Sequence, residues 1–313
     1  MAKEIVTTNS KATDTYVPFG GQVVDLGDEA VAPAPEFPLL QYATGLPARR
    51  PKLDSEGKQI IDEETGELLQ DNLFYAGFFA AQGQSKDLDE AMRDKNAQWL
   101  DIFHESSGKV VRHWVFEKTS LFIMAKGVPG GSKAEGECGI VYIWRKPNKL
   151  KKIKGGTVLY VQVILRQLLP NYKKPFVFTV SSTQTNDALK AIGKQYKVLE
   201  RAHELRRQHG NDIEMPLWAF SGLFGASKTQ DIRSNGTNSK TIFPMISGIP
   251  DDVPAAYLQR HEVPLQFVDH FKDTTEKAIE WAMALSQRIA NGIETQEPWK
   301  GHGGDAGSED HPF

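Results

Sequence analysis

Runs of alternating apolar and polar residues predict that the middle of the chain consists of β-strands. Four stretches there are rich in β-branched and aromatic residues, and turn-forming segments separate them. They are KVVRHWVFEK (109–118), ECGIVYIWRK (137–146), TVLYVQVILRQLL (157–169) and PFVFTVSS (175–182). We expect these strands to pair mainly in antiparallel fashion, because short turns connect neighbours of this kind.

Apolar residues at helical spacing predict three helices, over 85–106, 184–208 and 273–291. In the first helix the apolar side is formed by Leu88, Met92, Trp99 and Phe103. Further strands are expected at 38–44, 72–82, 215–225 and 239–247, with a polar hairpin around Glu64, Thr65 and Gly66.

These elements divide the chain into a core and two flexible ends. Residues 1–37 are expected to form a flexible arm, and 293–313 a flexible acidic tail. Within the core, 38–292, the middle of the chain contains about four strands, a helix and two strands, an order compatible with an OB-fold with extra elements at both ends. We therefore predict an α+β fold with a mainly antiparallel β core, an OB-fold-like partly open barrel with added helices. A curved antiparallel sheet of another topology would give nearly the same pattern.

Composition predicts a soluble protein of the reducing cytoplasm. Apolar residues make up 40% of the 313 residues, which is enough to bury a core. Cys138 is the only cysteine, so no internal disulfide and no cysteine-based metal site can form. The first residues are polar, and no stretch approaches the ~20 apolar residues of a membrane span.

Charge is strongly segregated along the chain, although the net charge is only −3. Residues 1–108 carry a net charge of −10, residues 109–174 a net charge of +11, and residues 175–313 a net charge of −4. Such asymmetry indicates a polyanionic partner. The alternative is that the fold mixes these charges on one surface.

Alternation along the strands places aromatic and basic side chains together on one face of the expected sheet. Cations neutralise phosphates and aromatic rings stack on bases, so this face suits a single-stranded nucleic acid. Alternatively, the rings could pack beneath a helix. The expected nucleic-acid-binding residues of the strands are Arg112, Trp114, Phe116, Lys118, Tyr142, Trp144, Lys146, Tyr160 and Arg166.

Two connections between strands are also basic. Residues 145–154 hold six cations in ten residues and no acid, and the turn 170–175 adds two more. Such a run is commonly a solvated loop and equally commonly a nucleic-acid clamp. The lysines expected to contact the nucleic acid are Lys149, Lys151, Lys152, Lys154, Lys173 and Lys174.

The last fourteen residues, KGHGGDAGSEDHPF, are glycine-rich, then acidic, and end in Pro312 and Phe313. This ending resembles that of bacterial single-stranded DNA-binding proteins, where a linker leads to an acidic tip closed by Asp-x-Pro-Phe. Asp310, Pro312 and Phe313 match that pattern, Glu309 adds an acid, and His311 stands where the family prefers an aliphatic residue. The resemblance, which covers about five residues, implies that this tip binds replication and repair proteins.

Catalytic motifs are absent from the sequence. It lacks the Gly-rich phosphate loops, HExxH and G-x-S-x-G, and its eight histidines are scattered. A two-metal nuclease would require converging carboxylates, which sequence alone does not exclude. We expect no enzymatic activity, no cofactor and no bound metal.

We therefore predict a single-stranded DNA-binding protein that coats DNA and recruits replication, recombination or repair proteins. Self-association into a homo-oligomer is left open, and no membrane partner is expected. One alternative is a phage- or plasmid-type recombination protein that anneals single strands. The other is a structural or assembly protein whose basic face binds another protein.

Overall fold

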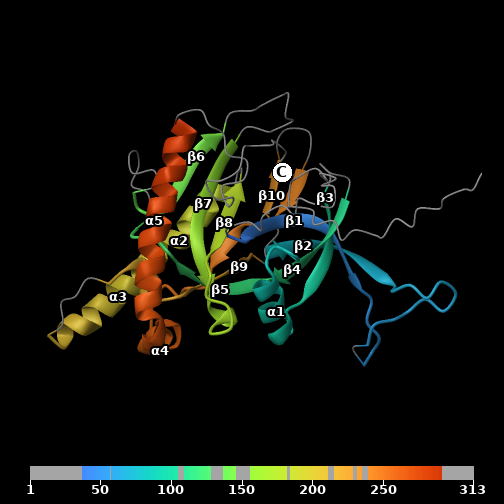
Figure 1. Ribbon diagram of the computed structural model, residues 1–313, viewed down its shortest axis with the longest axis horizontal. Coiled ribbons are helices and arrows are strands. Elements are labelled where there is room, and N and C mark those ends of the chain that lie inside the picture. The colour runs from blue at the N-terminus through green and yellow to red at the C-terminus, as the bar shows by residue number, and fades with distance from the viewer. Residues whose placement is uncertain are drawn as a thin grey trace, which may run out of the picture.

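The computed structural model describes nine stretches of the chain: residues 37–56, 58–104, 109–127, 137–145, 156–181, 184–210, 215–227, 231–234 and 239–290 (Figure 1). The expected arm up to residue 36 and the expected tail, 293–313, lie outside these stretches.

Ten of the strands found in the described residues join in one large sheet, whose pairs are antiparallel except for β1 with β8. Along the sheet the order is β12-β9-β5-β7-β8-β1-β2-β4-β3, with β6 also paired to β7. The strands are β1 (Leu39–Pro51), β2 (Gln70–Ala81), β3 (Trp99–His104), β4 (Lys109–Phe116), β5 (Lys118–Ile123), β6 (Ile140–Arg145), β7 (Gly156–Leu165), β8 (Phe176–Ser181), β9 (Gly222–Ala226) and β12 (Met245–Ser247). A separate hairpin is formed by β10 (Asp231–Ser234) and β11 (Ser239–Ile242).

The long strand β1 changes partner part-way along its length. Leu39–Gln41 pair with β8, whereas Ala48 and Arg49 pair with β3, and β2 follows β1 from Gln41 to Pro51. The register shifts between Thr44 and Leu46, around Gly45, whose φ of 130° few other residues adopt. This irregularity lets β1, β2, β4 and β3 close into a ring of paired strands at one end of the sheet.

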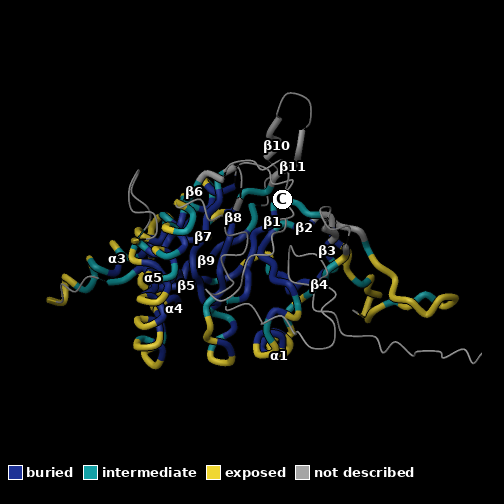
Figure 2. The backbone as a smooth tube through the Cα atoms, turned by 45° about the horizontal axis from the view of Figure 1, so that its top comes forward, coloured by how far each residue is buried: buried dark blue, intermediate teal, exposed yellow. Residues whose placement is uncertain are grey.

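Helices cover both faces of the sheet. On one face Phe78, Phe178 and Leu159 pack with α1 (Lys86–Asp94) and α2 (Gln184–Gly193). On the other face α5 (Val268–Ala290) packs on residues that include Tyr160 and Phe122. The remaining helices, α3 (Gln195–Gln208) and α4 (Ala255–His261), form a smaller cluster with the turn η2 (Leu217–Ala219). Figure 2 shows the resulting buried interior of the sheet.

The predicted α+β class and the mainly antiparallel sheet are confirmed, but the expected helix over 85–106 is wrong in its second half. Helix α1 stops at Asp94, and Asn96 has a left-handed φ of 50°. Residues 99–104 then form β3, because Trp99, Leu100 and Ile102 pair with β4. The expected helix 184–208 is interrupted at Lys194, and β5 was not predicted.

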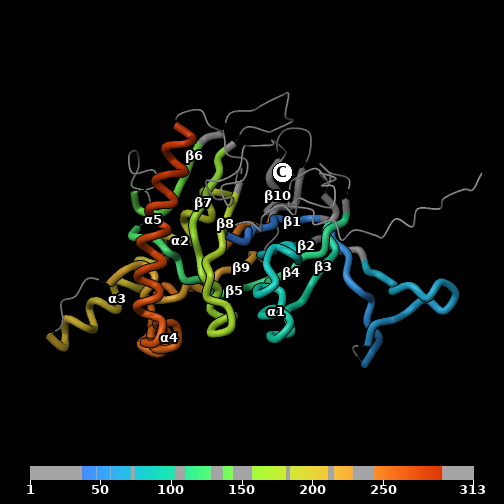
Figure 3. Tube along the Cα trace, viewed as in Figure 1, coloured from blue at the N-terminus to red at the C-terminus, as the bar shows by residue number. Residues whose placement is uncertain are grey.

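Figure 3 shows how the chain runs along the long axis of the molecule. Strands β1 to β4 lie at one end, and α3, α4 and the start of α5 lie at the other. None of the helices in the described stretches is both long enough and apolar enough to cross a membrane.

Candidate nucleic-acid interface

The structure divides the expected binding face between the two sides of the sheet. In the pairing of β6 with β7, Tyr142 lies opposite Leu159 and Val141 lies opposite Tyr160. Directly paired residues share a face, so Tyr142 and Tyr160 point to opposite sides. The prediction that these residues form one continuous surface is therefore wrong.

Two of the expected aromatic residues belong to the core. Trp114 is 4% exposed, and its indole Nε1 donates a hydrogen bond to Asp89 Oδ1 of α1 at 2.7 Å. Tyr160 is 3% exposed beneath α5. Neither ring can stack on a base in this structure, so packing beneath a helix, the alternative left open by the sequence, applies to both. Phe116 is half-buried against the same core as Trp114.

Tyr142 is the one expected ring of β6 whose side chain the structure describes, and it is half-buried. Its hydroxyl donates to Asn186 Oδ1 on the first turn of α2 at 3.1 Å. The neighbouring hydroxyls of Thr157 and Thr185 lie 2.6 Å apart and link the start of β7 to the same turn. We call Tyr142, Thr157, Thr185 and Asn186 the β6–β7 tip.

The β6–β7 tip lies where the basic connection joins the sheet. Arg145 and Gly156 are paired, so the chain leaves the sheet after Arg145 and returns to it at Gly156. The N-terminus of α2 is at the same end, since its Thr185 contacts Thr157. A helix N-terminus carries a partial positive charge and favours anions, although Asp187 in this first turn opposes that effect.

The remaining basic residues are distributed over the molecule. Arg112 donates to Asp101 Oδ1 at 2.9 Å and stacks on Trp99, and Lys118 is exposed at the start of β5. Arg166 donates to the carbonyl of Glu262 at 2.9 Å, and burial lowers its pKa. Lys173 lies over the ring of Phe267 and Lys174 pairs with Asp87 at 3.0 Å.

The second basic turn lies at the other end of β7 from the β6–β7 tip. Lys173 and Lys174 follow the end of β7, whereas residues 146–155 precede its start. A ten-residue strand spans about 30 Å, so roughly the full height of β7 separates Lys173 and Lys174 from the β6–β7 tip. The structure thus does not bring Lys173 and Lys174 to the β6–β7 tip.

Several predicted residues lie outside the described parts of the structure. They are the side chain of Trp144, the lysines Lys146, Lys149, Lys151, Lys152 and Lys154, and the tail residues Glu309, Asp310, Pro312 and Phe313. Sequence reasoning also missed Thr157, Thr185 and Asn186. The run of polar residues in TQTND is a helix-start signal, and it could have indicated that this turn meets the sheet.

Two features of the described residues bear on catalysis. They contain no cluster of three or more His, Cys, Asp or Glu side chains that could hold a metal ion. Ser221 Oγ lies 3.0 Å from His261 Nδ1, the spacing of a nucleophile and its base, but the serine is fully buried. This pair instead joins the start of β9 to α4.

Comparisons with known proteins find no match among family models, curated proteins or solved structures.

Proposed function

We propose that the chain binds single-stranded DNA, with the phosphates held near the β6–β7 tip. The observation that carries this proposal is the net charge of +11 in residues 109–174, in a chain whose net charge is −3. Six of these cations are concentrated in residues 145–154 of the sequence. The paired residues that flank this connection, Arg145 and Gly156, are at the same end of β6 and β7 as the hydroxyls of the tip. Concentrated cations release counterions from a nucleic acid, which supplies most of the non-specific affinity.

The geometry of the tip supports a revised contact surface. Both faces of the sheet are covered by helices, so a strand of DNA would bind at the end of the sheet rather than across a face. Tyr142 is half-buried there and presents its hydroxyl rather than a free ring. In this arrangement the phosphates, more than stacked bases, would provide the affinity.

The ring formed by β1, β2, β4 and β3 supports a finer proposal about the fold. A long strand that bends and pairs with three neighbours is how a small antiparallel sheet closes into a partly open barrel. We propose that this ring is the OB-like part of the molecule, with the strands from β5 onward added to it.

The experiment is a salt-titrated binding assay with single-stranded DNA, duplex DNA and RNA. Replacing Lys149, Lys151, Lys152 and Lys154 with Gln is expected to weaken binding to all DNA sequences alike. Each lost phosphate contact removes about 0.7 from the slope of log affinity against log salt, so the slope should fall by roughly 3.

A matched variant separates a local effect from a change in net charge. It replaces four exposed lysines outside residues 109–174, namely Lys52, Lys95, Lys190 and Lys277. This variant loses the same charge and is expected to keep nearly the original slope. Equal slopes in both variants, or no binding by the unaltered chain, would contradict the proposal.

A further inference from the structure

Phosphate contacts at the β6–β7 tip do not distinguish single-stranded from duplex DNA. Both forms carry phosphates, so cations that bind phosphates give affinity without a preference between the two forms. A preference for single strands requires a surface on which an unpaired base can stack, because the bases of a duplex are already stacked on one another. A surface of this kind lies on the outside of the ring formed by β1, β2, β4 and β3.

The register of this ring places an arginine on either side of one carboxylate. Asp101 of β3 is paired with Arg49 of β1 and with Arg112 of β4. Directly paired residues share a face of a sheet. The next residues, Ala48 and Ile102, are also paired, and both are buried in the core. Successive residues point to opposite faces, so Arg49, Asp101 and Arg112 lie on the outer face of the ring.

Two contacts fix the orientation of the Arg112 guanidinium. Its Nε and Nη2 donate to the two carboxylate oxygens of Asp101, at 2.9 and 3.3 Å. Its central carbon lies 3.8 Å from the centre of the Trp99 ring, so the cation lies over the aromatic face. The Arg112 side chain is nevertheless 48% exposed. We call Arg49, Trp99, Asp101 and Arg112 the arginine platform.

The exposed part of the Arg112 guanidinium suits an unpaired base. Nucleobases stack on arginine planes as they do on aromatic rings. Pairing with Asp101 uses N–H groups of Nε and Nη2, which leaves those of Nη1 for a phosphate or a base edge. Because Trp99 and Asp101 already hold the side chain, less conformational entropy is lost when a ligand binds.

Arg112 differs from the two other cations that lie over aromatic rings in the described stretches. Arg166 and Lys173 are each 5.6 Å from the centre of a phenylalanine ring. Arg166 Nη1 already donates to the carbonyl of Glu262, and Lys173 has no planar group on which a base could stack. Of these three cations, Arg112 therefore offers the most suitable surface for a base.

The charges of the arginine platform favour an anion. Its two arginines and one aspartate give a net charge of +1, and Arg49 is exposed. The neighbouring pair of Arg50 and Asp71 lies one residue further along each strand. Alternation places that pair on the opposite face, so Asp71 does not face a strand of DNA on the platform.

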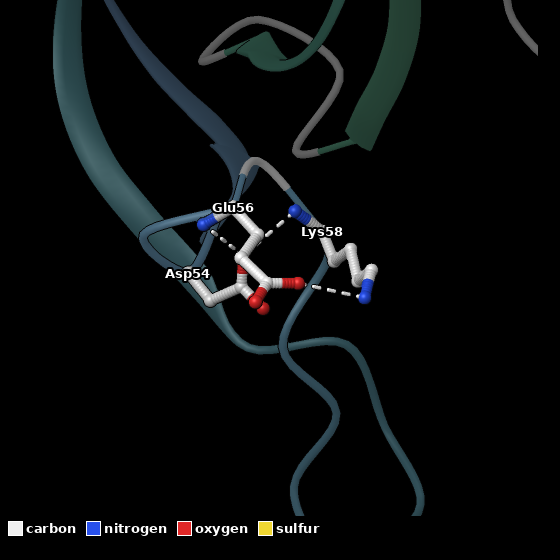
Figure 4. A network of polar contacts seen from close by, with 3 residues as sticks. All are labelled: Asp54, Glu56 and Lys58. Carbon is white, nitrogen blue, oxygen red and sulfur yellow. Dashed lines mark hydrogen bonds and ion pairs between the residues drawn. The ribbon is translucent and has the colours of Figure 1, made fainter.

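The acidic segment that follows β1, residues 52–69, projects from the end of the molecule (Figures 1 and 2). Asp54, its first carboxylate, accepts hydrogen bonds from the backbone N–H groups of Glu56 and Lys58, and Glu56 pairs with Lys58, all at 2.8 Å (Figure 4). Five residues of extended chain, about 17 Å, separate Asp54 from Arg49. The Debye length at physiological salt is about 8 Å, so this carboxylate has little effect on an anion at Arg49.

We propose that an unpaired base of single-stranded DNA stacks on Arg112 of the arginine platform, with an adjacent phosphate on Arg49. This inference rests on the proposed function and assigns its preference for single strands to a second surface. The cations of residues 145–154 supply affinity for either form of DNA, and the arginine platform selects the single strand.

The experiment compares single-stranded and duplex DNA of one sequence, each at several salt concentrations. Arg112→Lys keeps the positive charge and removes the plane. Its salt slope should therefore stay the same, while its affinity for single-stranded DNA falls by at least about fivefold through lost stacking. Its affinity for duplex DNA should not change. Arg112→Gln also removes the charge, so it should in addition lower the single-strand salt slope by about 0.7.

Arg207→Lys is the matched control, because it makes the same change at an exposed arginine near the end of α3. This variant should bind both forms of DNA as the unaltered chain does. Ultraviolet cross-linking to single-stranded DNA that carries 5-bromodeoxyuridine gives a second measurement. Mass spectrometry should find cross-links in the peptides that contain Trp99 or Arg112.

The experiment separates failure of this inference from failure of the proposed function. If the unaltered chain binds no DNA, the proposed function is wrong and the inference is wrong with it. If the chain binds single-stranded and duplex DNA equally, or if Arg112→Lys keeps the original preference, DNA binding stands and the arginine platform does not select the strand. Cross-links confined to other peptides would likewise overturn the assignment.

Discussion

Trp114 illustrates how a single polar atom decides the role of an aromatic residue. Its indole Nε1 bonds Asp89 Oδ1, while Asp89 Oδ2 accepts from the backbone N–H of Gly83 at 2.8 Å. Asp89 itself is buried, so it depends on these two donors. The tryptophan thus helps to fix α1 on the sheet.

Replacing Trp114 with Phe keeps most of the apolar ring and removes the donor. The free energy of unfolding should fall by about 1–3 kcal/mol, because a buried carboxylate loses a hydrogen bond. Urea unfolding measures this change, and DNA affinity per folded molecule should not alter. In a double-mutant cycle with Asp89→Ala the two effects should be clearly less than additive, and additive losses would contradict the assigned contact.

His261 makes folding sensitive to pH. Burial lowers its pKa, and the charges of Arg166 and Arg260 lower it further. An unfolded chain therefore binds a proton more readily than the folded one. The contribution of His261 to the free energy of unfolding is fully present above its ordinary pKa of about 6.5. It decreases as the pH falls from there through the lower pKa that His261 has in the folded chain.

The corresponding test compares thermal unfolding at several pH values between neutral and mildly acidic. In His261→Gln the midpoint should fall less steeply with acidification than in the unaltered chain. His209→Gln, which removes an exposed imidazole at the end of α3, is the matched control. If both variants lose the same pH dependence, His261 is not the responsible group.

At the level of elements, the sequence predicted well wherever local pattern and tertiary structure agree. The apolar alternation of β4, β6, β7 and β8 identified four strands, and the spacing in 273–291 identified most of α5. The prediction of one helix over 85–106 failed because Trp99 and Phe103 fit a helical pattern as well as a strand pattern. Pairing with β4, which the local sequence does not encode, decided between them.

The candidate interface was harder to predict for a related reason. Alternation tells which residues of one strand share a face, but not which faces of neighbouring strands coincide. In the observed register Tyr160 is paired with Val141, and both side chains lie on the face that α5 covers. The charge pattern does not depend on register, and it remains the basis of the proposed function.

The turn between α1 and β3 is expected to depend on Asn96. Asn and Gly tolerate its positive φ, whereas for other residues this backbone conformation costs about 1–2 kcal/mol. Asn96→Ala should therefore lower the free energy of unfolding by about that amount, and Asn96→Gly should be nearly neutral. Equal losses in the two variants, measured by urea unfolding, would mean that the side chain of Asn96 matters more than its backbone.

For the whole molecule, the acidic tail (293–313) and the cations of residues 109–174 are expected to act on each other. Residues 294–313 hold five carboxylates and one lysine, so they can compete weakly with DNA for cations at low salt. Deleting 308–313 should leave DNA affinity equal or slightly higher and abolish capture of replication or repair partners. Removing Phe313 alone should give the same loss of partners. A lower DNA affinity with all partners retained would show that the resemblance of the tail is accidental.

The pairing of β1 with β8 also has a consequence for synthesis on the ribosome. Leu39–Gln41 bond to Val177–Thr179, so one edge of β1 stays without this partner until more than one hundred further residues have been made. At a synthesis rate of about 5–20 residues per second, the wait is on the order of 10 s. During that time the nascent chain exposes a strand edge able to pair with neighbouring chains. We therefore expect this edge to stay exposed for longer when synthesis is slower.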